Sequence, residues 1–207
     1  MKIVVTGSAG LVGSNIVRTL LNSGDTVTAM VHRDRRALEG LDVTIAAGDI
    51  EDVDSLRGVF AGVDAVVHSA GYVSIRKNEW DKLQRLNVHS THNVAQACLD
   101  TGVKKLVYIS SVHALKQEPL DEPLDENRDL ALGSSFTPYD QSKAMAELEI
   151  QQAAQQGLHT IILRPTAVIG PHDYHPSALG KAIYYLSSGK WPAVVQGGFD
   201  WGDARGV

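Results

Sequence analysis

The sequence holds a single cysteine, Cys98, so it has no pair from which an internal disulfide could form. A lone thiol is typical of proteins from reducing compartments, and we expect a cytoplasmic location. Because Cys98 stands in an apolar segment with helical spacing, we interpret it as a buried, unreactive thiol. The apolar run at the start is only Ile3-Val4-Val5, which is too short for a signal peptide or a membrane span.

Positive charge is not in excess either. The chain has 19 Lys and Arg against 24 Asp and Glu, a formal net charge of -5. This balance argues against nucleic acid or an anionic membrane as a partner. The 207 residues, 43% hydrophobic and 21% charged, are ordinary for a soluble protein and sufficient for one large domain.

What the sequence does have begins with a glycine-rich turn. An apolar strand that starts at residue 2 leads into Thr6-Gly7-Ser8-Ala9-Gly10-Leu11-Val12-Gly13, and helical spacing follows. Small residues at such a turn let the backbone approach a pyrophosphate, toward which the new helix directs its N–H groups. The spacing is G-x-x-G-x-x-G rather than G-x-G-x-x-G, so an ordinary strand-to-helix turn is the alternative. Its place directly after the first strand favours a nucleotide site.

Short apolar strands then alternate with helical segments along the chain. This alternation predicts right-handed βαβ units and a parallel sheet with helices on both faces, a doubly wound Rossmann-type α/β fold. We expect further strands at 25–31, 43–47, 63–68, 105–110 and 158–163, and helices at 14–21, 53–60, 78–100, 138–156 and 177–188.

The end of the second strand bears on the choice of dinucleotide. Proteins that bind NAD usually have an acidic residue there for the ribose 2′-hydroxyl, whereas an Arg suits the 2′-phosphate of NADP. Arg33 lies about twenty residues past the glycine turn and favours NADP. A solvated basic turn is an alternative, and Asp34 could instead favour NAD.

Two further strand ends carry candidate cofactor contacts. Asp49, with Ile50, could accept a hydrogen bond from an adenine amine, although a helix cap explains this Asp nearly as well. Ala70 and Gly71 are small enough to let a cofactor pass close over the backbone. We interpret His68, just before them, as a core histidine rather than a catalyst.

The candidate chemistry lies in Tyr139-Asp140-Gln141-Ser142-Lys143. Tyr139 and Lys143 are four residues apart and share one face of a helix that begins at Pro138. A nearby ammonium lowers the pKa of a phenol, which suits acid–base work. A surface pair is the alternative, but Ser110-Ser111 ends the fifth strand, where ligands bind in such sheets. No G-x-S-x-G motif surrounds these serines, which disfavours a triad hydrolase.

Taken together, these motifs resemble those of the extended short-chain dehydrogenase/reductase family, which includes NAD-dependent epimerase/dehydratase-like and dihydroflavonol-reductase-like members. The resemblance covers residues 1 to about 171. The matching motifs are Thr6-Gly7-x-x-Gly10-x-x-Gly13, Asp49-Ile50, His68-Ser69-Ala70-Gly71, Asn87-Val88, Ser110-Ser111, Tyr139-x-x-Ser142-Lys143 and Leu163-Arg164-Pro165-Thr166-x-Val168-x-Gly170-Pro171.

The resemblance implies a role for each of these residues. Tyr139 would be the acid/base, Lys143 would lower its pKa and hold the ribose, and Ser111 would orient the substrate oxygen. Asn87 would support a proton-relay water, although it could equally be a surface residue of its helix. The implied cofactor-binding residues are Gly7, Ala9, Gly10, Leu11, Val12, Gly13, Arg33, Asp49, Ile50, Ala70, Gly71, Tyr139, Lys143, Pro165 and Val168. Members commonly pair two helices, here 78–100 and 138–156, so we also expect a homodimer.

We therefore predict an NADP-preferring oxidoreductase that acts on a carbonyl or a secondary alcohol of a small molecule, with no metal. Residues 1–171 would bind the dinucleotide and carry the catalytic groups, and residues 172–207 would begin an incomplete substrate-binding region. Two alternatives remain open. One is a sugar-nucleotide epimerase or dehydratase with bound NAD, although Val112 and His113 follow Ser111 where dehydratases have acidic residues. The other is a dinucleotide-binding protein without turnover.

Overall fold

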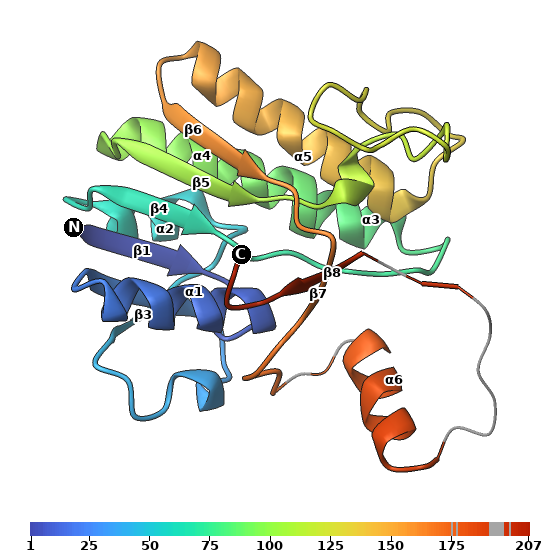
Figure 1. Ribbon diagram of the computed structural model, residues 1–207. Coiled ribbons are helices and arrows are strands. Elements are labelled where there is room, and N and C mark those ends of the chain that lie inside the picture. The colour runs from blue at the N-terminus through green and yellow to red at the C-terminus, as the bar shows by residue number, and fades with distance from the viewer. Residues whose placement is uncertain (175, 177, 191–196, 199) are drawn as a thin grey trace.

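Six parallel strands form the central sheet in the order β3-β2-β1-β4-β5-β6 (Figure 1). The computed structural model describes residues 1–174, 176, 178–190, 197–198 and 200–207. The strand order reverses between β1 and β4, and ligands of doubly wound sheets bind at such a switch point. The predicted Rossmann-type fold is therefore confirmed. The six strands are β1 Lys2–Thr6, β2 Thr26–Val31, β3 Thr44–Ala47, β4 Ala65–His68, β5 Lys105–Ile109 and β6 His159–Leu163.

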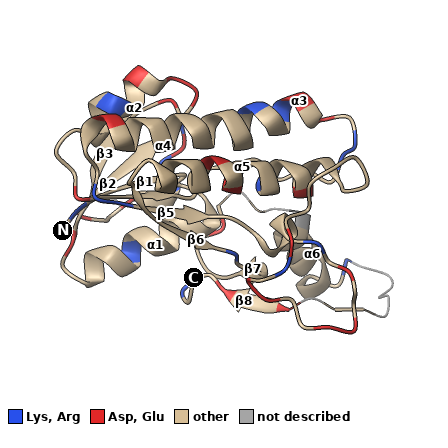
Figure 2. Cartoon of the chain, turned by 90° about the horizontal axis from the view of Figure 1, so that it is seen from above, with Lys and Arg blue, Asp and Glu red and all other residues tan. Residues whose placement is uncertain are grey.

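Helices cover both faces of this sheet. α1 lies on one face, and α2, α4 and α5 lie on the other, where Figure 2 shows α4 and α5 side by side. The first three of these helices are α1 Leu11–Asn22, α2 Val53–Phe60 and α4 Ser90–Thr101; α5 spans Pro138–Gln155. Short 3-10 turns span Arg36–Leu38 and Val112–Ala114.

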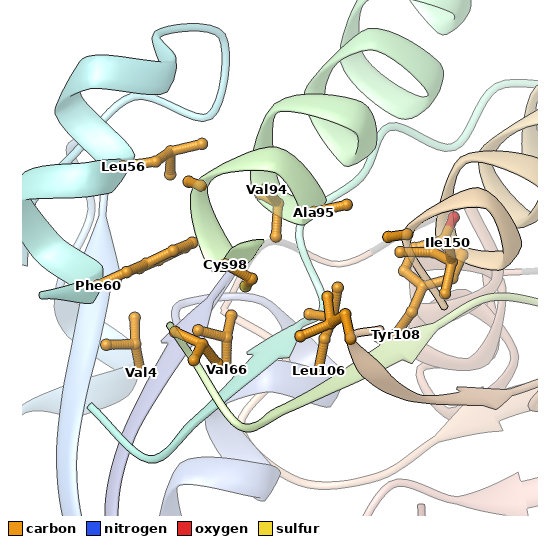
Figure 3. Packing of buried hydrophobic residues seen from close by; sticks show 14 of the residues in the cluster. Val4, Leu56, Phe60, Val66, Val94, Ala95, Cys98, Leu106, Tyr108 and Ile150 are labelled. Carbon is orange, nitrogen blue, oxygen red and sulfur yellow. The ribbon is translucent and has the colours of Figure 1, made fainter. Parts of the chain in front are cut away.

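Apolar side chains of α2, α4 and α5 meet those of the sheet in the larger of two cores. Phe60 and Leu56 of α2 face Cys98 and Val94 of α4, over Val66 and its neighbours on the strands (Figure 3). All five side chains are fully buried, and burial raises the pKa of the Cys98 thiol. Cys98 is thus the buried, inert thiol that the sequence indicates. This core fixes the strand ends on which the site is built.

The expected long helix at 78–100 contains an irregularity. It consists of α3 Trp80–Leu83, a π-helical segment Gln84–His89, and α4. Segments of π-helix are rare and frequently occur at functional sites.

Toward the C-terminus, α6 spans Ala178–Ser187, and Ser177 of the predicted helix lies outside the described residues. A second, two-stranded parallel sheet joins β7 Ala167–Ile169 to β8 Trp201–Asp203, which the sequence does not predict. Within the described residues, no helix has the length and apolar character needed to cross a bilayer.

α1 begins at Leu11, three residues earlier than expected, because its glycines pack against backbone. Gly7 has a φ of +66°, and a Cβ there would lie 2.5 Å from the Ala70 nitrogen. A Cβ on Gly13 would lie 2.2 Å from the Gly7 carbonyl oxygen and 2.7 Å from Ser69 Oγ. Two of the three glycines therefore bring the first turn of α1 onto the ends of β1 and β4.

We expect Gly13→Ala to lower both the free energy of unfolding and the affinity for a dinucleotide, since α1 must move away from Gly7. A matched control is Gly58→Ala in α2, where nothing lies within 4 Å of the added Cβ. That change should raise the free energy of unfolding by about 0.5–1 kcal/mol through the lower entropy of the unfolded chain. Urea unfolding of both variants checks the contrast, and equal stabilities would contradict it.

Candidate active site

Two adjoining cavities lie at the carboxyl edge of the sheet. They share Ser69, Ala70, Gly71 and Tyr72, so together they form one groove across the switch point. The first has a volume of about 400 Å³ and lies over the ends of β1, β2 and β3. The second has a volume of about 200 Å³ and lies between the end of β5, α5 and the segment after β6.

The first cavity is lined by most of the predicted cofactor contacts, namely Gly7, Ala9, Gly10, Arg33, Asp49, Ile50, Ala70 and Gly71. Val12 lines the second cavity instead. Leu11 and Gly13 line neither cavity; they form the first turn of α1, whose N-cap, Gly10, has no side-chain capping bond. The first amide groups of a helix have no partner within it and suit a phosphate. The residues present therefore fit a dinucleotide.

At the end of β2, the acidic and basic candidates differ in their contacts. Asp34 forms a two-pronged ion pair with Arg36, with Nη2 to Oδ2 at 2.6 Å and Nε to Oδ1 at 3.1 Å. Arg33 is exposed and lines the cavity. His32 lines it too, and the sequence analysis missed that residue. Arg33 and Asp34 thus both line the cavity, and the carboxylate of Asp34 is already paired with Arg36.

Asp49 is not the N-cap of α2, which was the alternative interpretation of this residue. The cap of α2 is Asp52, whose carboxylate accepts from the Asp54 amide at 3.0 Å. Asp49 lines the cavity and accepts from the Glu51 amide at 2.9 Å. It is therefore placed as a cavity residue rather than as the helix cap.

The second cavity brings together Ser111, Tyr139, Lys143 and Asn87, with Pro165 and Val168 on its wall. α5 starts at Pro138 after a capping box in which Thr137 and Asp140 bond each other's backbone amides. This start places Tyr139 in the first turn of the helix, and Lys143 follows one turn later. The Ser111 hydroxyl acts to lower the pKa of Tyr139. Lys143 is only 5% exposed, so the pair is not a surface pair.

The electrostatics of this pair differ from the expectation. Lys143 Nζ donates to the Tyr108 hydroxyl at 2.8 Å and to the Ile109 carbonyl at 3.0 Å. Burial lowers the pKa of Lys143 to about 7, against the opposing charge of Glu147. Burial also raises the pKa of Tyr139, and the opposing effect of the Ser111 hydroxyl offsets this rise only in part. The predicted lowering of the Tyr139 pKa by Lys143 is therefore wrong for this structure, because desolvation dominates and the ammonium bonds to β5.

Asn87 lies in the π-helical segment and is buried. Its Oδ1 accepts from the Tyr72 amide at 2.7 Å, and its Nδ2 donates to the Tyr72 carbonyl and to Ser142 Oγ, both at 2.9 Å. Asn87 thus ties the shared wall of the two cavities to α5. The alternative of a surface residue is wrong.

The two histidines near the site have different environments. His68 is fully buried between Thr6 Oγ1 at 2.7 Å and Thr91 Oγ1 at 3.1 Å, and burial lowers its pKa to about 3. It is the core histidine that the sequence indicates. His113 is half-exposed; its Nδ1 lies 3.0 Å from Asp140 Oδ1, and this contact raises the pKa of the imidazole.

Two residues to which the sequence analysis assigned no role, Tyr108 and Glu147, support the site. Tyr108 accepts from Lys143, and Glu147 bonds Ser110 and Arg164 from within the core. Glu147 stands four residues after Lys143, so helical spacing was a usable signal for it. Tyr108 gave no such signal, because a strand residue three positions before a serine has no distinctive pattern.

Comparison with known proteins identifies the family of this chain. A profile described as the NAD dependent epimerase/dehydratase family matches residues 3–197. The chain belongs to this family. It thereby falls within the extended short-chain dehydrogenase/reductases, as its motifs indicate.

Members similar to this chain include enzymes with different names. Sterol demethylase protein B of Methylococcus capsulatus is 35% identical over 100% of this chain and 63% of its own length. A putative dihydroflavonol 4-reductase of Synechocystis is 34% identical over 98% of this chain and 60% of its own length. A UDP-glucose 4-epimerase of Thermus thermophilus, solved with NAD, is 25% identical with a TM-score of 0.83, covering 99% of this chain and 71% of that one. The chain thus spans less than two thirds of the length of the two curated relatives.

Proposed function

We propose that this protein is an NADP-preferring oxidoreductase that reduces a carbonyl group, or oxidises a secondary alcohol, of a small molecule. The observation that carries the proposal is the convergence of Ser111, Tyr139 and Lys143 in one cavity next to the cavity that Arg33 lines. The family membership and the reductase among its relatives support it.

In this proposal each residue has a defined task. Tyr139 donates its hydroxyl proton to the substrate oxygen, and its raised pKa keeps that proton on the phenol at neutral pH, as reduction requires. Ser111, which lines the same cavity as Tyr139, orients the same oxygen. Lys143 would hold the nicotinamide ribose through its ammonium group. When bound, the nicotinamide supplies the hydride in reduction and accepts it in oxidation.

The direct test is a screen of the purified chain for carbonyl-dependent oxidation of NADPH. We expect turnover with at least one aldehyde or ketone and saturable NADPH binding. Binding without turnover for any carbonyl would favour the alternative of a dinucleotide-binding protein. The epimerase alternative rests on the similarity to the UDP-glucose 4-epimerase, and it predicts NAD that copurifies with the protein and conversion of a sugar nucleotide.

The choice of NADP is tested by Arg33→Ala. Only NADPH loses a charge-assisted contact of about 1.5–3 kcal/mol, so its Kd should rise about 10- to 150-fold while that of NADH changes little. Fluorescence titration measures both constants. Arg35→Ala is the matched control, since Arg35 is exposed but does not line the cavity. Tighter binding of NADH than of NADPH by the unaltered protein would overturn the preference.

We also propose a homodimer that pairs α4 and α5 of two copies. These helices lie side by side (Figure 2). Leu148 on α5 is 40% exposed. Light scattering at micromolar concentration should give twice the mass of the chain; the mass of one chain would contradict the dimer. The lone, buried Cys98 supports a cytoplasmic location as a further proposal.

A further inference from the structure

Glu147 is a fully buried carboxylate that lines neither cavity of the groove. Its Oε1 accepts from Ser110 Oγ and, at 3.0 Å, from Arg164 Nε. Its Oε2 accepts from Arg164 Nη2 at 2.7 Å. A buried charge is tolerated only when it is paired and hydrogen-bonded, and both oxygens of Glu147 meet that condition.

These contacts join three elements that each carry a site residue. Ser110 precedes Ser111, Arg164 precedes Pro165, and α5 carries Glu147 together with Tyr139 and Lys143. Backbone bonds continue the connection, from the Ser110 amide to the Leu163 carbonyl at 2.7 Å and from the Val112 amide to the Pro165 carbonyl at 3.1 Å. One carboxylate therefore holds α5, the end of β5 and the segment after β6 at fixed positions.

Glu147 also faces the charge of Lys143 along the helix. The two side chains are four residues apart, on the same face of α5, and both are buried, so little water screens their attraction. The hydrogen-bond acceptors of the ammonium, the Tyr108 hydroxyl and the Ile109 carbonyl, are neutral. The other titratable or charged groups nearby are His68 on β4, Tyr139 on α5, and Arg164 beyond β6, which is 18% exposed.

We propose that Glu147 is a positioning residue of the site, whose carboxylate favours the charged form of Lys143 while it ties the Ser110 and Arg164 segments to α5. This inference rests on the proposed function in one respect, namely that the charged Lys143 holds the nicotinamide ribose. It assigns to Glu147 no contact with substrate or cofactor.

The test is Glu147→Gln, which keeps the shape of the side chain and removes its charge. The readout is the titration of Lys143 in ligand-free protein by NMR of ¹³C-labelled lysine, with the signal assigned from Lys143→Met. We expect the midpoint of this titration to fall by about one pH unit or more. Glu149→Gln is the matched control, because Glu149 is on the same helix but pairs with the exposed His92. The Lys143 midpoint in this variant should equal that of the wild type.

Two further variants separate charge from architecture. Arg164→Gln removes a positive charge, so the Lys143 midpoint should rise. Ser110→Ala removes a hydrogen bond without altering charge, so the Lys143 midpoint should stay unchanged in that variant. If Glu147→Gln fails to fold, the double variant with Arg164→Gln is compared with Arg164→Gln alone, and the midpoint should again fall.

An unchanged Lys143 midpoint in folded Glu147→Gln, or in the double variant, overturns the inference. The outcome does not depend on turnover. If the wild type were inactive in the carbonyl screen, the proposed function would be wrong. The lysine titration would still test the role of Glu147.

Discussion

Tyr139→Phe should lower turnover by about 10²- to 10⁴-fold, the range typical of a lost acid/base group, while leaving the affinity for the dinucleotide nearly unchanged. The change removes the hydroxyl and keeps the aromatic ring that lines the second cavity. Steady-state kinetics with the best carbonyl of the screen, together with fluorescence titration of NADPH, measure the two quantities separately.

A Tyr→Phe control is available on α6, where Tyr184 is 60% exposed and lines neither cavity. Tyr184→Phe should retain full turnover. If Tyr139→Phe also retained it, the acid/base assignment would be wrong. His113 would then be the candidate, because its ring contacts Tyr139 edge-on at 5.8 Å between centroids and Asp140 raises its pKa.

Lys143→Met should abolish most turnover and weaken dinucleotide binding, and it should nevertheless increase the free energy of unfolding. Met replaces a buried ammonium by an apolar chain of similar length, and such replacements are often stabilising. The pKa of Lys143 is about 7 when folded and near 10.5 when unfolded, so between these values the unfolded chain binds more protons. The contribution of Lys143 to the free energy of unfolding of the wild type therefore becomes more favourable as the pH rises from 7 to about 10.5.

The gain in Lys143→Met should accordingly be largest below pH 7 and shrink toward pH 10. Urea unfolding at pH 6 and pH 9 checks this sign. A variant less stable than the wild type at pH 6 would show that the contacts with Tyr108 and Ile109 outweigh the cost of burying the charge.

The sheet was predictable because its strands are short, apolar and separated by helical segments. Their alternation is a local property of the sequence, and the parallel arrangement follows from the handedness of βαβ units. The groove followed as well, since parallel strands place their carboxyl ends at one edge. Ser111 and Ala70 could thus be brought together from strand ends more than 40 residues apart.

What could not be predicted depends on contacts that have no local pattern. β7 and β8 have three residues each and pair across a long segment of chain, so neither carries a periodic signal. The direction of the Tyr139 pKa depends on how deeply the phenol is buried, which the spacing of Tyr139 and Lys143 does not contain. The occupation of Asp34 by Arg36 likewise depends on side-chain orientation.

The π-helical turn Gln84–His89 has a consequence for the length of its helix. A π turn contains one residue more than an α turn, so it is equivalent to a single-residue insertion that shifts the preceding helix by about 100° around its axis. The insertion lets Asn87 reach Tyr72 and Ser142 while α4 keeps Val94 and Cys98 on the sheet. Removal of one residue here would give a more regular helix and withdraw the Asn87 amide from the site. The extra residue in this turn therefore interrupts the regular α-helix and places the Asn87 amide at the wall that the two cavities share.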